Sequence, residues 1–205
     1  MTIQFTKPQF FYHQKVENHD LIKCALLPHI LSYYHTHQKD SNYTWGITQT
    51  VSSSNHENED DLYILKEVIT DSMYKDIIWN PLDNMMKELH ENTYNVPQES
   101  FLSSLWWNVY PAGSFAQPHT HRGHDLSGVY FLHMNERNTL MFQPASQDNL
   151  FAFTDRVYDT EHIPEGHVIL FPSMLQHYVN PCKEMRVSIS FNIRCSQKVI
   201  TSPFH

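Results

Sequence analysis

The stretch Met-Arg-Val-Ser-Ile-Ser-Phe-Asn-Ile, residues 185–193, decides the fold, because apolar and polar side chains alternate strictly along it. Successive side chains of a β-strand point to opposite faces, so this period of two predicts a strand with one apolar and one polar face. A polar face of this kind either meets water or lines the interior of a barrel. The stretch by itself leaves both possibilities open.

Further strand-like runs fill the second half of the chain. Each is a short series of aromatic and β-branched residues bounded by turn residues. Besides 185–193, they are residues 102–110, 126–134, 139–142 and 167–171. Several short strands at this spacing predict a sandwich, a barrel or a jelly roll.

The first half of the chain shows helical spacing instead. Apolar residues recur at helical intervals over residues 62–77, and Pro81 is expected to open a second short helix, because proline suits a first turn. An earlier helix over residues 20–34 is expected to be interrupted at Pro28, which lacks a backbone donor. The chain is therefore predicted to be mainly β with N-terminal helices.

The length and the composition narrow the classes of protein further. A chain of 205 residues suits a single domain, in which a helical extension over 1–100 packs on a β-core over 101–205. The net charge of −8, without a run of lysine or arginine, argues against nucleic-acid or membrane binding. No apolar stretch approaches the about 20 residues of a membrane span, and residues 1–15 show no signal-peptide pattern. Three cysteines without metal-type spacing favour free thiols in a reducing cytoplasm.

Three elements of the second half fit together as a binding site. His119-Thr120-His121 precedes the predicted strand 126–134, and side chains two residues apart on an extended segment point the same way. Both imidazoles can therefore reach one metal ion. His177 lies further along the chain, and Arg186 with Ser188 follows on one face of the last strand.

The chemistry of such a set points to a redox metal. Non-haem Fe(II) oxygenases hold the metal by three protein ligands and leave the other positions open. A keto-diacid co-substrate that chelates iron at one end needs a cation at the other. The planar fork of Arg186 can bind such a carboxylate at two points, and the Ser188 hydroxyl can add a hydrogen bond. The conjunction of these elements is far more specific than the His-x-His pair alone.

At this point the chain resembles a known family, the 2-oxoglutarate–Fe(II) oxygenases of bacteria and phages. The resemblance rests on short segments that occur in the family's order and cover about the last half of the chain. They are Asn108-Val109-Tyr110, Pro118-His119-Thr120-His121, Ser127-Gly128-Val129-Tyr130-Phe131-Leu132, Leu170-Phe171-Pro172-Ser173 with His177, and Arg186-Val187-Ser188-Ile189-Ser190-Phe191-Asn192.

The resemblance implies a double-stranded β-helix, a jelly roll of the cupin-like kind, that uses Fe(II), 2-oxoglutarate and O2. It implies that iron lies between the His119–His121 segment and His177, and that Arg186 holds the distal carboxylate of 2-oxoglutarate. It further implies that hydrogen bonds to the co-substrate come from nearby polar side chains. The candidates are Ser188, Tyr130, Asn108 and Tyr110.

One position departs from the pattern of the broader superfamily. His121 stands where the usual motif has a carboxylate. Either His121 is a ligand and the iron site has three histidines, or Asp125 supplies the carboxylate beside one histidine, or the site binds metal poorly. A neutral third ligand leaves the Fe(II) centre one positive charge higher than a carboxylate would.

The expected function is oxidation of a C–H bond, by default hydroxylation, in a small molecule or an amino acid, while 2-oxoglutarate is decarboxylated to succinate. We expect no protein nucleophile or general base beyond the metal centre. A cupin-type three-histidine dioxygenase that needs no 2-oxoglutarate is the first alternative, but it leaves Arg186 and Ser188 unexplained. A non-catalytic jelly-roll binding module is the second, and the convergence of the histidines with Arg186 argues against it.

Overall fold

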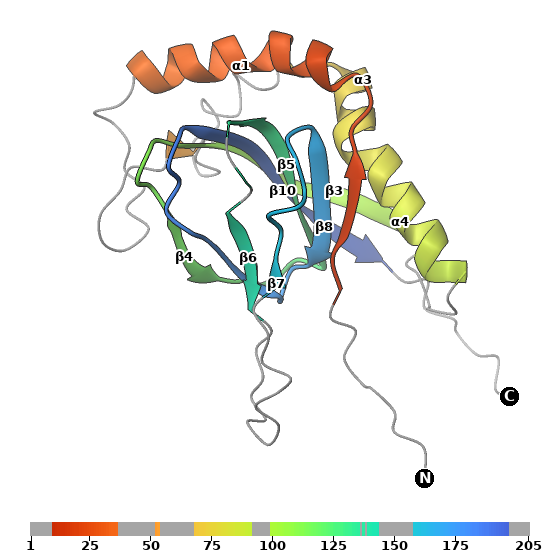
Figure 1. Ribbon diagram of the computed structural model, residues 1–205. Helices are drawn as coiled ribbons and strands as arrows, with labels where there is room; N and C mark the ends of the chain where they lie inside the picture. The colour runs from red at the N-terminus through yellow and green to blue at the C-terminus, as the bar shows by residue number, and fades with distance from the viewer. Residues whose placement is uncertain are drawn as a thin grey trace, which may run out of the picture.

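The structure is a computed structural model that describes residues 10–36, 52–53, 68–91, 99–135, 137, 139–143 and 158–196. Two antiparallel sheets lie at its centre, and helices lie outside one of them (Figure 1). No helix in the described part of the chain is long and apolar enough to cross a membrane.

The larger sheet, here the major sheet, has six strands in the order β1-β8-β5-β10-β3-β2, and all its neighbouring pairs are antiparallel. Its strands are β1 (Tyr12–Lys15), β2 (Ser52–Ser53), β3 (Glu99–Tyr110), β5 (Leu126–Met134), β8 (His167–Pro172) and β10 (Arg186–Ser196). The predicted strands over 102–110, 126–134, 167–171 and 185–193 are all confirmed within this sheet. β10 lies between β3 and β5, so the alternating stretch 185–193 forms an interior strand of the sheet.

The smaller sheet, here the minor sheet, has four strands in the order β4-β9-β6-β7. Its strands are β4 (Ala116–His119), β6 (Leu140–Gln143), β7 (Tyr158–Asp159) and β9 (Gln176–Val179). The predicted strand over 139–142 corresponds to β6, whereas β4, β7 and β9 were not predicted. These strands are short, and β4 contains a proline and an irregular register, so they carry little β-periodicity.

The two faces of the major sheet bury different kinds of residue. On β10, Val187, Ile189 and Phe191 belong to an apolar core on the helix side, and all three are fully buried. The opposite face looks toward the minor sheet, and Phe131 of β5 packs there in one cluster with Phe142 of β6. Arg186, Ser188 and Ser190 are also buried, which settles the question left open by the sequence: the polar face of β10 lines the interior.

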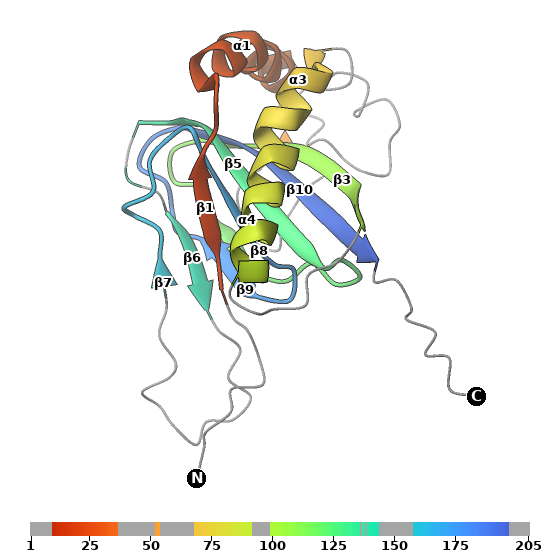
Figure 2. The ribbon, with the colours of Figure 1, turned by 90° about the vertical axis from the view of Figure 1, so that its right-hand side faces the viewer.

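The helices cover the outer face of the major sheet. Helix α1 (His19–Thr36) buries one residue in every four, namely Ile22, Leu26, Ile30 and Tyr34. A second helical rod consists of α3 (Asp71–Tyr74), the π-helical turn η1 (Lys75–Trp79) and α4 (Asn80–Glu91). Figure 2 shows α4 crossing in front of the major sheet, where Leu82 and Met85 enter the same core.

Two predictions about these helices were wrong. Helix α1 continues through Pro28, because Pro28 is exposed and water can satisfy the carbonyl that it leaves without a donor. Pro81 does not open a separate helix but lies inside the continuous rod Asp71–Glu91. The backbone N–H of Asn80 bonds the carbonyl of Lys75, five residues earlier, so the helix widens just before the proline that cannot donate. The first residues of the predicted helix, 62–67, lie outside the described part.

Candidate metal and co-substrate site

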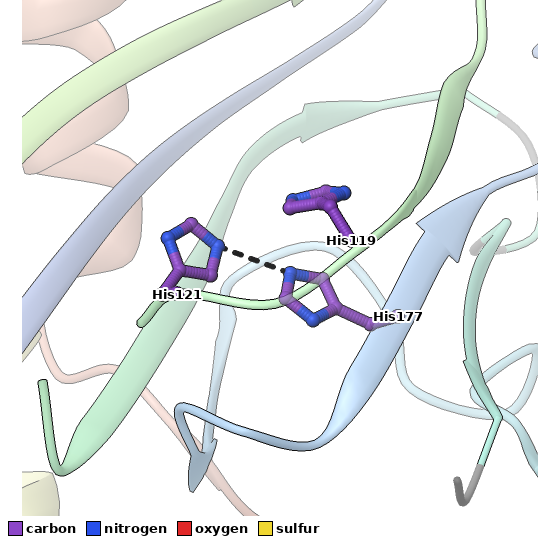
Figure 3. A group of neighbouring side chains, drawn as sticks. All are labelled: His119, His121 and His177. Atoms are coloured by element: carbon purple, nitrogen blue, oxygen red, sulfur yellow. Dashed lines mark hydrogen bonds between the residues drawn. The ribbon is translucent and has the colours of Figure 1, made fainter. Parts of the chain in front are cut away.

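Three histidines from two segments meet between the sheets. His119 ends β4 and pairs with His177 of β9, while His121 lies two residues beyond the end of β4. One ring nitrogen of each lies within 4.8 Å of one ring nitrogen of the other two (Figure 3). The described residues contain no other cluster of three such groups, so the structure brings together the triad that the sequence predicted.

Backbone carbonyls fix the orientation of two of these rings. Nδ1 of His119 lies 2.7 Å from the carbonyl oxygen of Gln117, and Nδ1 of His177 lies 2.9 Å from that of Leu175. A carbonyl can only accept, so each Nδ1 carries the proton and donates it. Each Nε2 therefore keeps its lone pair, which is the form that binds a metal.

The spacing of the nitrogens suits a metal ion. Nε2 of His121 lies 3.2 Å from Nε2 of His177. Two nitrogens bound at the about 2.0–2.1 Å seen for imidazole on zinc lie roughly 2.9–3.4 Å apart when they subtend about 90–110° at the metal. An all-imidazole donor set is also one that Fe(II) accepts. The residues present therefore fit a metal of this kind.

Burial keeps two of these imidazoles, those of His119 and His177, neutral. His177 is 4% exposed, and burial, reinforced by the neighbouring His119, lowers its pKa to about 3. Burial likewise lowers the pKa of His119. Because removing a charge from water costs free energy, both rings stay unprotonated at neutral pH and do not repel a cation.

A buried arginine lies in the same cavity. Arg186 is 2% exposed, and its guanidinium carbon lies 5.4 Å from the ring centre of Tyr110 and 5.1 Å from that of Phe131. One guanidinium nitrogen donates to the Thr139 hydroxyl at 3.3 Å. A fixed positive charge beside a neutral ligand set makes this cavity suitable for an anion that also reaches the metal.

The predicted helpers of Arg186 lie around the same cavity, with one exception. Ser188, Asn108 and Tyr110 all line it, and Asn108 and Ser188 are directly opposite each other on β3 and β10. The Asn108 amide donates to the Ser190 hydroxyl at 3.0 Å. Burial raises the pKa of Tyr110 to about 12, so its phenol keeps its proton and can donate it.

The exception is Tyr130, and the prediction that it faces the co-substrate pocket is wrong. Val129 and Phe131 point into the barrel interior, so Tyr130 between them points out into the helix-side core. Its hydroxyl lies 2.6 Å from Nδ1 of His19 at the start of α1. Tyr130 therefore connects β5 to α1 and does not line the cavity.

The carboxylate of Asp125 also lies away from the triad. Asp125 is exposed and accepts a hydrogen bond from the backbone N–H of Cys195 at 2.8 Å. The geometry thus favours His121 over Asp125 as the third group of the site.

Several residues that line the cavity were not predicted from the sequence. Ser190 follows Ser188 on the polar face of β10, and Trp106 precedes Asn108 by two residues on β3, so the same alternation could have found both. The Trp106 ring lies 5.5 Å from the His121 ring. Thr139 could not have been found, because its approach to Arg186 depends on how the minor sheet packs.

Comparison with known proteins agrees with this site. Residues 104–192 match the model of the family described as "Putative 2OG-Fe(II) oxygenase", a span that contains all three histidines and Arg186. A search of curated proteins gives no match to the chain.

Solved structures share the fold at low sequence identity. The epimerase SnoN from nogalamycin biosynthesis, described as non-haem and α-ketoglutarate dependent, is 14% identical with a TM-score of 0.61, over 91% of this chain and 78% of that one. A prolyl hydroxylase from Trichoplax adhaerens is 15% identical with a TM-score of 0.53, over 90% of this chain and 83% of that one. A prolyl-4-hydroxylase from Pseudomonas putida is 15% identical with a TM-score of 0.51, over 92% of this chain and 94% of that one. At such identities the likeness shows the fold alone.

The fold is a double-stranded β-helix, as predicted, and one cavity inside it contains the three histidines and the buried Arg186. The part of the chain that forms this cavity, residues 104–192, matches the 2-oxoglutarate–Fe(II) oxygenase family, which uses Fe(II), 2-oxoglutarate and O2, and its three histidines suit such an iron site.

Proposed function

We propose that His119, His121 and His177 hold the Fe(II), that Arg186 binds the distal carboxylate of 2-oxoglutarate, and that the enzyme hydroxylates a C–H bond. The substrate we propose is a small molecule or an amino acid, with decarboxylation of 2-oxoglutarate to succinate. The observation that carries the proposal is that one cavity contains both the histidine triad and the buried Arg186. When bound, the iron and its co-substrates supply the oxidising chemistry, which no side chain here could supply.

The side chains divide the remaining work between holding and orienting. The carbonyls of Gln117 and Leu175 accept the Nδ1 protons of His119 and His177, so both rings offer Nε2 without rearranging. The rings of Tyr110 and Phe131 and the Thr139 hydroxyl hold the guanidinium of Arg186 in place before the co-substrate arrives. Little conformational entropy is then lost on binding.

A row of donors leads along β10 from the arginine. Ser188 is two residues from Arg186 on the same strand face, a separation of about 6.6–6.8 Å along an extended chain. The Ser188 hydroxyl is thus close enough to Arg186 to donate to the same carboxylate, and the Tyr110 phenol can add a third donor.

The rest of the cavity wall excludes water. Leu140, Phe171 and Val179 line it, and all three are at most 4% exposed. A dry wall strengthens the attraction between a guanidinium and a carboxylate, because the effective dielectric constant is lower than in water.

Two further features suit the expected setting. Cys24, Cys182 and Cys195 are free thiols, which suits the proposed reducing cytoplasm. The helices of the first half and the major sheet share one apolar core, which favours a single folding unit over two separate domains.

Anaerobic spectroscopy tests the proposal. Protein mixed with Fe(II) and 2-oxoglutarate under argon should give a weak visible charge-transfer band, and admission of O2 with a substrate should release succinate. His177→Ala should abolish the band by removing a ligand. If turnover instead proceeds without 2-oxoglutarate, the chain is a three-histidine dioxygenase of the cupin type, and if neither iron nor another metal binds stoichiometrically, it is a binding module.

A further inference from the structure

A chain of hydrogen-bonded polar side chains, most of them buried, runs across the major sheet at the edge of the cavity that contains the triad. The Ser127 hydroxyl donates to the Asn192 amide oxygen at 2.7 Å, and the Asn192 amide nitrogen donates to the Ser104 hydroxyl at 2.8 Å. The hydroxyls of Ser127 and Ser173 lie 2.9 Å apart. Since the single proton of Ser127 is used toward Asn192, Ser173 must be the donor in that pair. We call Ser173, Ser127, Asn192 and Ser104 the polar chain.

The polar chain ends in the turn between β8 and β9, residues 173–175. The turn is closed by the backbone N–H of Leu175, which donates to the carbonyl of Pro172 at 2.8 Å. Ser173 is fully buried in it, and its hydroxyl is fixed by the polar chain. Ser127 and Asn192, the next two members, are 2% and 4% exposed.

The same turn holds two of the three histidines. The carbonyl of Ser173 accepts the backbone N–H of His121 at 2.8 Å, and the carbonyl of Leu175 accepts Nδ1 of His177 at 2.9 Å. His121 lies beyond the last residue of β4, so the strand ladder ends before it and this hydrogen bond ties its backbone to the turn. The turn thereby sets how His121 and His177 face each other.

We propose that the polar chain is the positioning device of the metal site, and that Ser173 is its key residue because it joins the chain to the turn that carries both histidines. This inference rests on the proposed function, since it assumes that the triad binds the metal. Ser173 touches neither metal nor co-substrate, so it is a positioning residue. It acts by keeping the Nε2 atoms of His121 and His177 at their short separation of 3.2 Å.

The physical reason is that a buried polar network is stable in one arrangement only. Each group in the polar chain has its partner, and any shift of the turn would leave a buried hydroxyl or amide without one, which is costly. An apolar residue in place of Ser173 would remove this penalty. The turn would then be held by backbone hydrogen bonds alone, among them that from the Ser173 N–H to the Asp125 carbonyl at 3.0 Å, and it could shift together with the two histidines that it holds.

Titration of the metal-free protein with Co(II) alone tests the inference, with the visible absorption of the bound ion as a report of ligand geometry. Ser173→Ala should weaken Co(II) binding about 10- to 100-fold, as loss of an outer partner of a metal ligand does elsewhere. It should also change the shape of the absorption band, which a loss of stability alone would not do. Ser127→Ala should cause a smaller loss, and Ser104→Ala, at the far end, the smallest.

Two matched controls come from the same molecule. Thr160 is fully buried and its hydroxyl donates to the carbonyl of Leu140 at 2.9 Å, so Thr160→Val removes a comparable buried hydrogen bond outside the polar chain. Met174 is in the same turn but 57% exposed, so Met174→Ala tests side-chain removal there. Both controls should keep the affinity and the band of the unmodified protein.

The outcomes separate the two proposals. If the unmodified protein does not bind Co(II) at one equivalent, the proposed function fails and this inference fails with it. If it binds, but Ser173→Ala and Ser127→Ala keep the affinity and the band of Thr160→Val, the inference alone is overturned. Should Ser173→Ala not fold, Ser127→Ala and the milder Ser104→Ala, at a half-buried position, decide the matter by the same comparison.

Discussion

Replacement of Arg186 should weaken 2-oxoglutarate binding while leaving metal binding intact. Arg186 is 2% exposed and is held between the rings of Tyr110 and Phe131, so the carboxylate it meets is largely removed from water. Removing one partner of such a buried charge pair costs roughly 2–5 kcal/mol. Arg186→Gln should therefore weaken 2-oxoglutarate binding about 30- to 4,000-fold, since each 1.4 kcal/mol is a factor of ten.

A lysine at the same position separates charge from geometry. Arg186→Lys keeps the positive charge but loses the planar fork, so about one charge-assisted hydrogen bond of roughly 1.5–3 kcal/mol disappears. The affinity for 2-oxoglutarate should fall about 10- to 150-fold, so that it lies between the affinities of the unmodified protein and of Arg186→Gln. A graded series of this kind would identify a bidentate contact.

The assay is a calorimetric titration of the Mn(II)-loaded protein with 2-oxoglutarate in the absence of O2. Arg137→Gln is the matched control, because Arg137 carries the same charge but is 82% exposed and pairs with Glu161 on the surface. The reasoning is refuted if Arg186→Gln binds 2-oxoglutarate as tightly as Arg137→Gln does. A loss of Mn(II) affinity in Arg186→Gln before 2-oxoglutarate is added would also contradict it.

Three further predictions concern the scaffold. Gly128→Ala should destabilise the fold by about 1–3 kcal/mol in urea unfolding, because a Cβ there would overlap the fully buried ring of Phe191; unchanged stability would mean that the two strands can separate. On account of His177, the free energy of unfolding of the metal-free protein should fall by about 1 kcal/mol for each pH unit between about pH 6.5 and pH 3, because the unfolded chain takes up a proton there that the folded chain, with a His177 pKa of about 3, does not. His177→Gln should reduce that slope, and an equal slope in both proteins would assign it elsewhere. Glu165→Gln should cost about 1 kcal/mol of unfolding free energy above pH 5. Burial raises the pKa of the Glu165 carboxyl, but hydrogen bonds donated by Lys23 and by the backbone N–H of Met134 lower it by more. The difference from the unmodified protein should shrink as the pH falls toward 4, and a constant difference would show that the charge is not responsible.

The alternation on β10 predicted the most about this protein. It assigned Arg186 and Ser188 to one face of a strand and Val187 and Ile189 to the other, and the structure confirms this division. The alternation could not say whether the polar face meets water or a second sheet. That depends on β4, β6 and β9, whose packing is a long-range property that no local pattern encodes.

Tyr130 shows where alternation carries no information. β5 is buried on both faces, so its apolar residues form a continuous run and hydrophobicity does not distinguish inside from outside. The register with β10 decides: Tyr130 pairs with Ile189 and Val129 with Ser190, which puts Tyr130 on the apolar face of the sheet. A shift of one residue would have reversed the assignment, and only the pairing fixes it.

The same division of strand faces explains why helices α1 and α4 cover the major sheet. Side chains alternate along a strand, so the apolar residues of β10 that lie between its inward-facing polar residues point away from the interior. Val187, Ile189 and Phe191 would then meet water, at a cost of roughly 1.5–3 kcal/mol for each side chain. Helices α1 and α4 keep these three side chains out of water, because each helix packs its buried apolar residues against them in one core. The polar face of β10 that makes the site thus also creates the need for a helical cover on the opposite face.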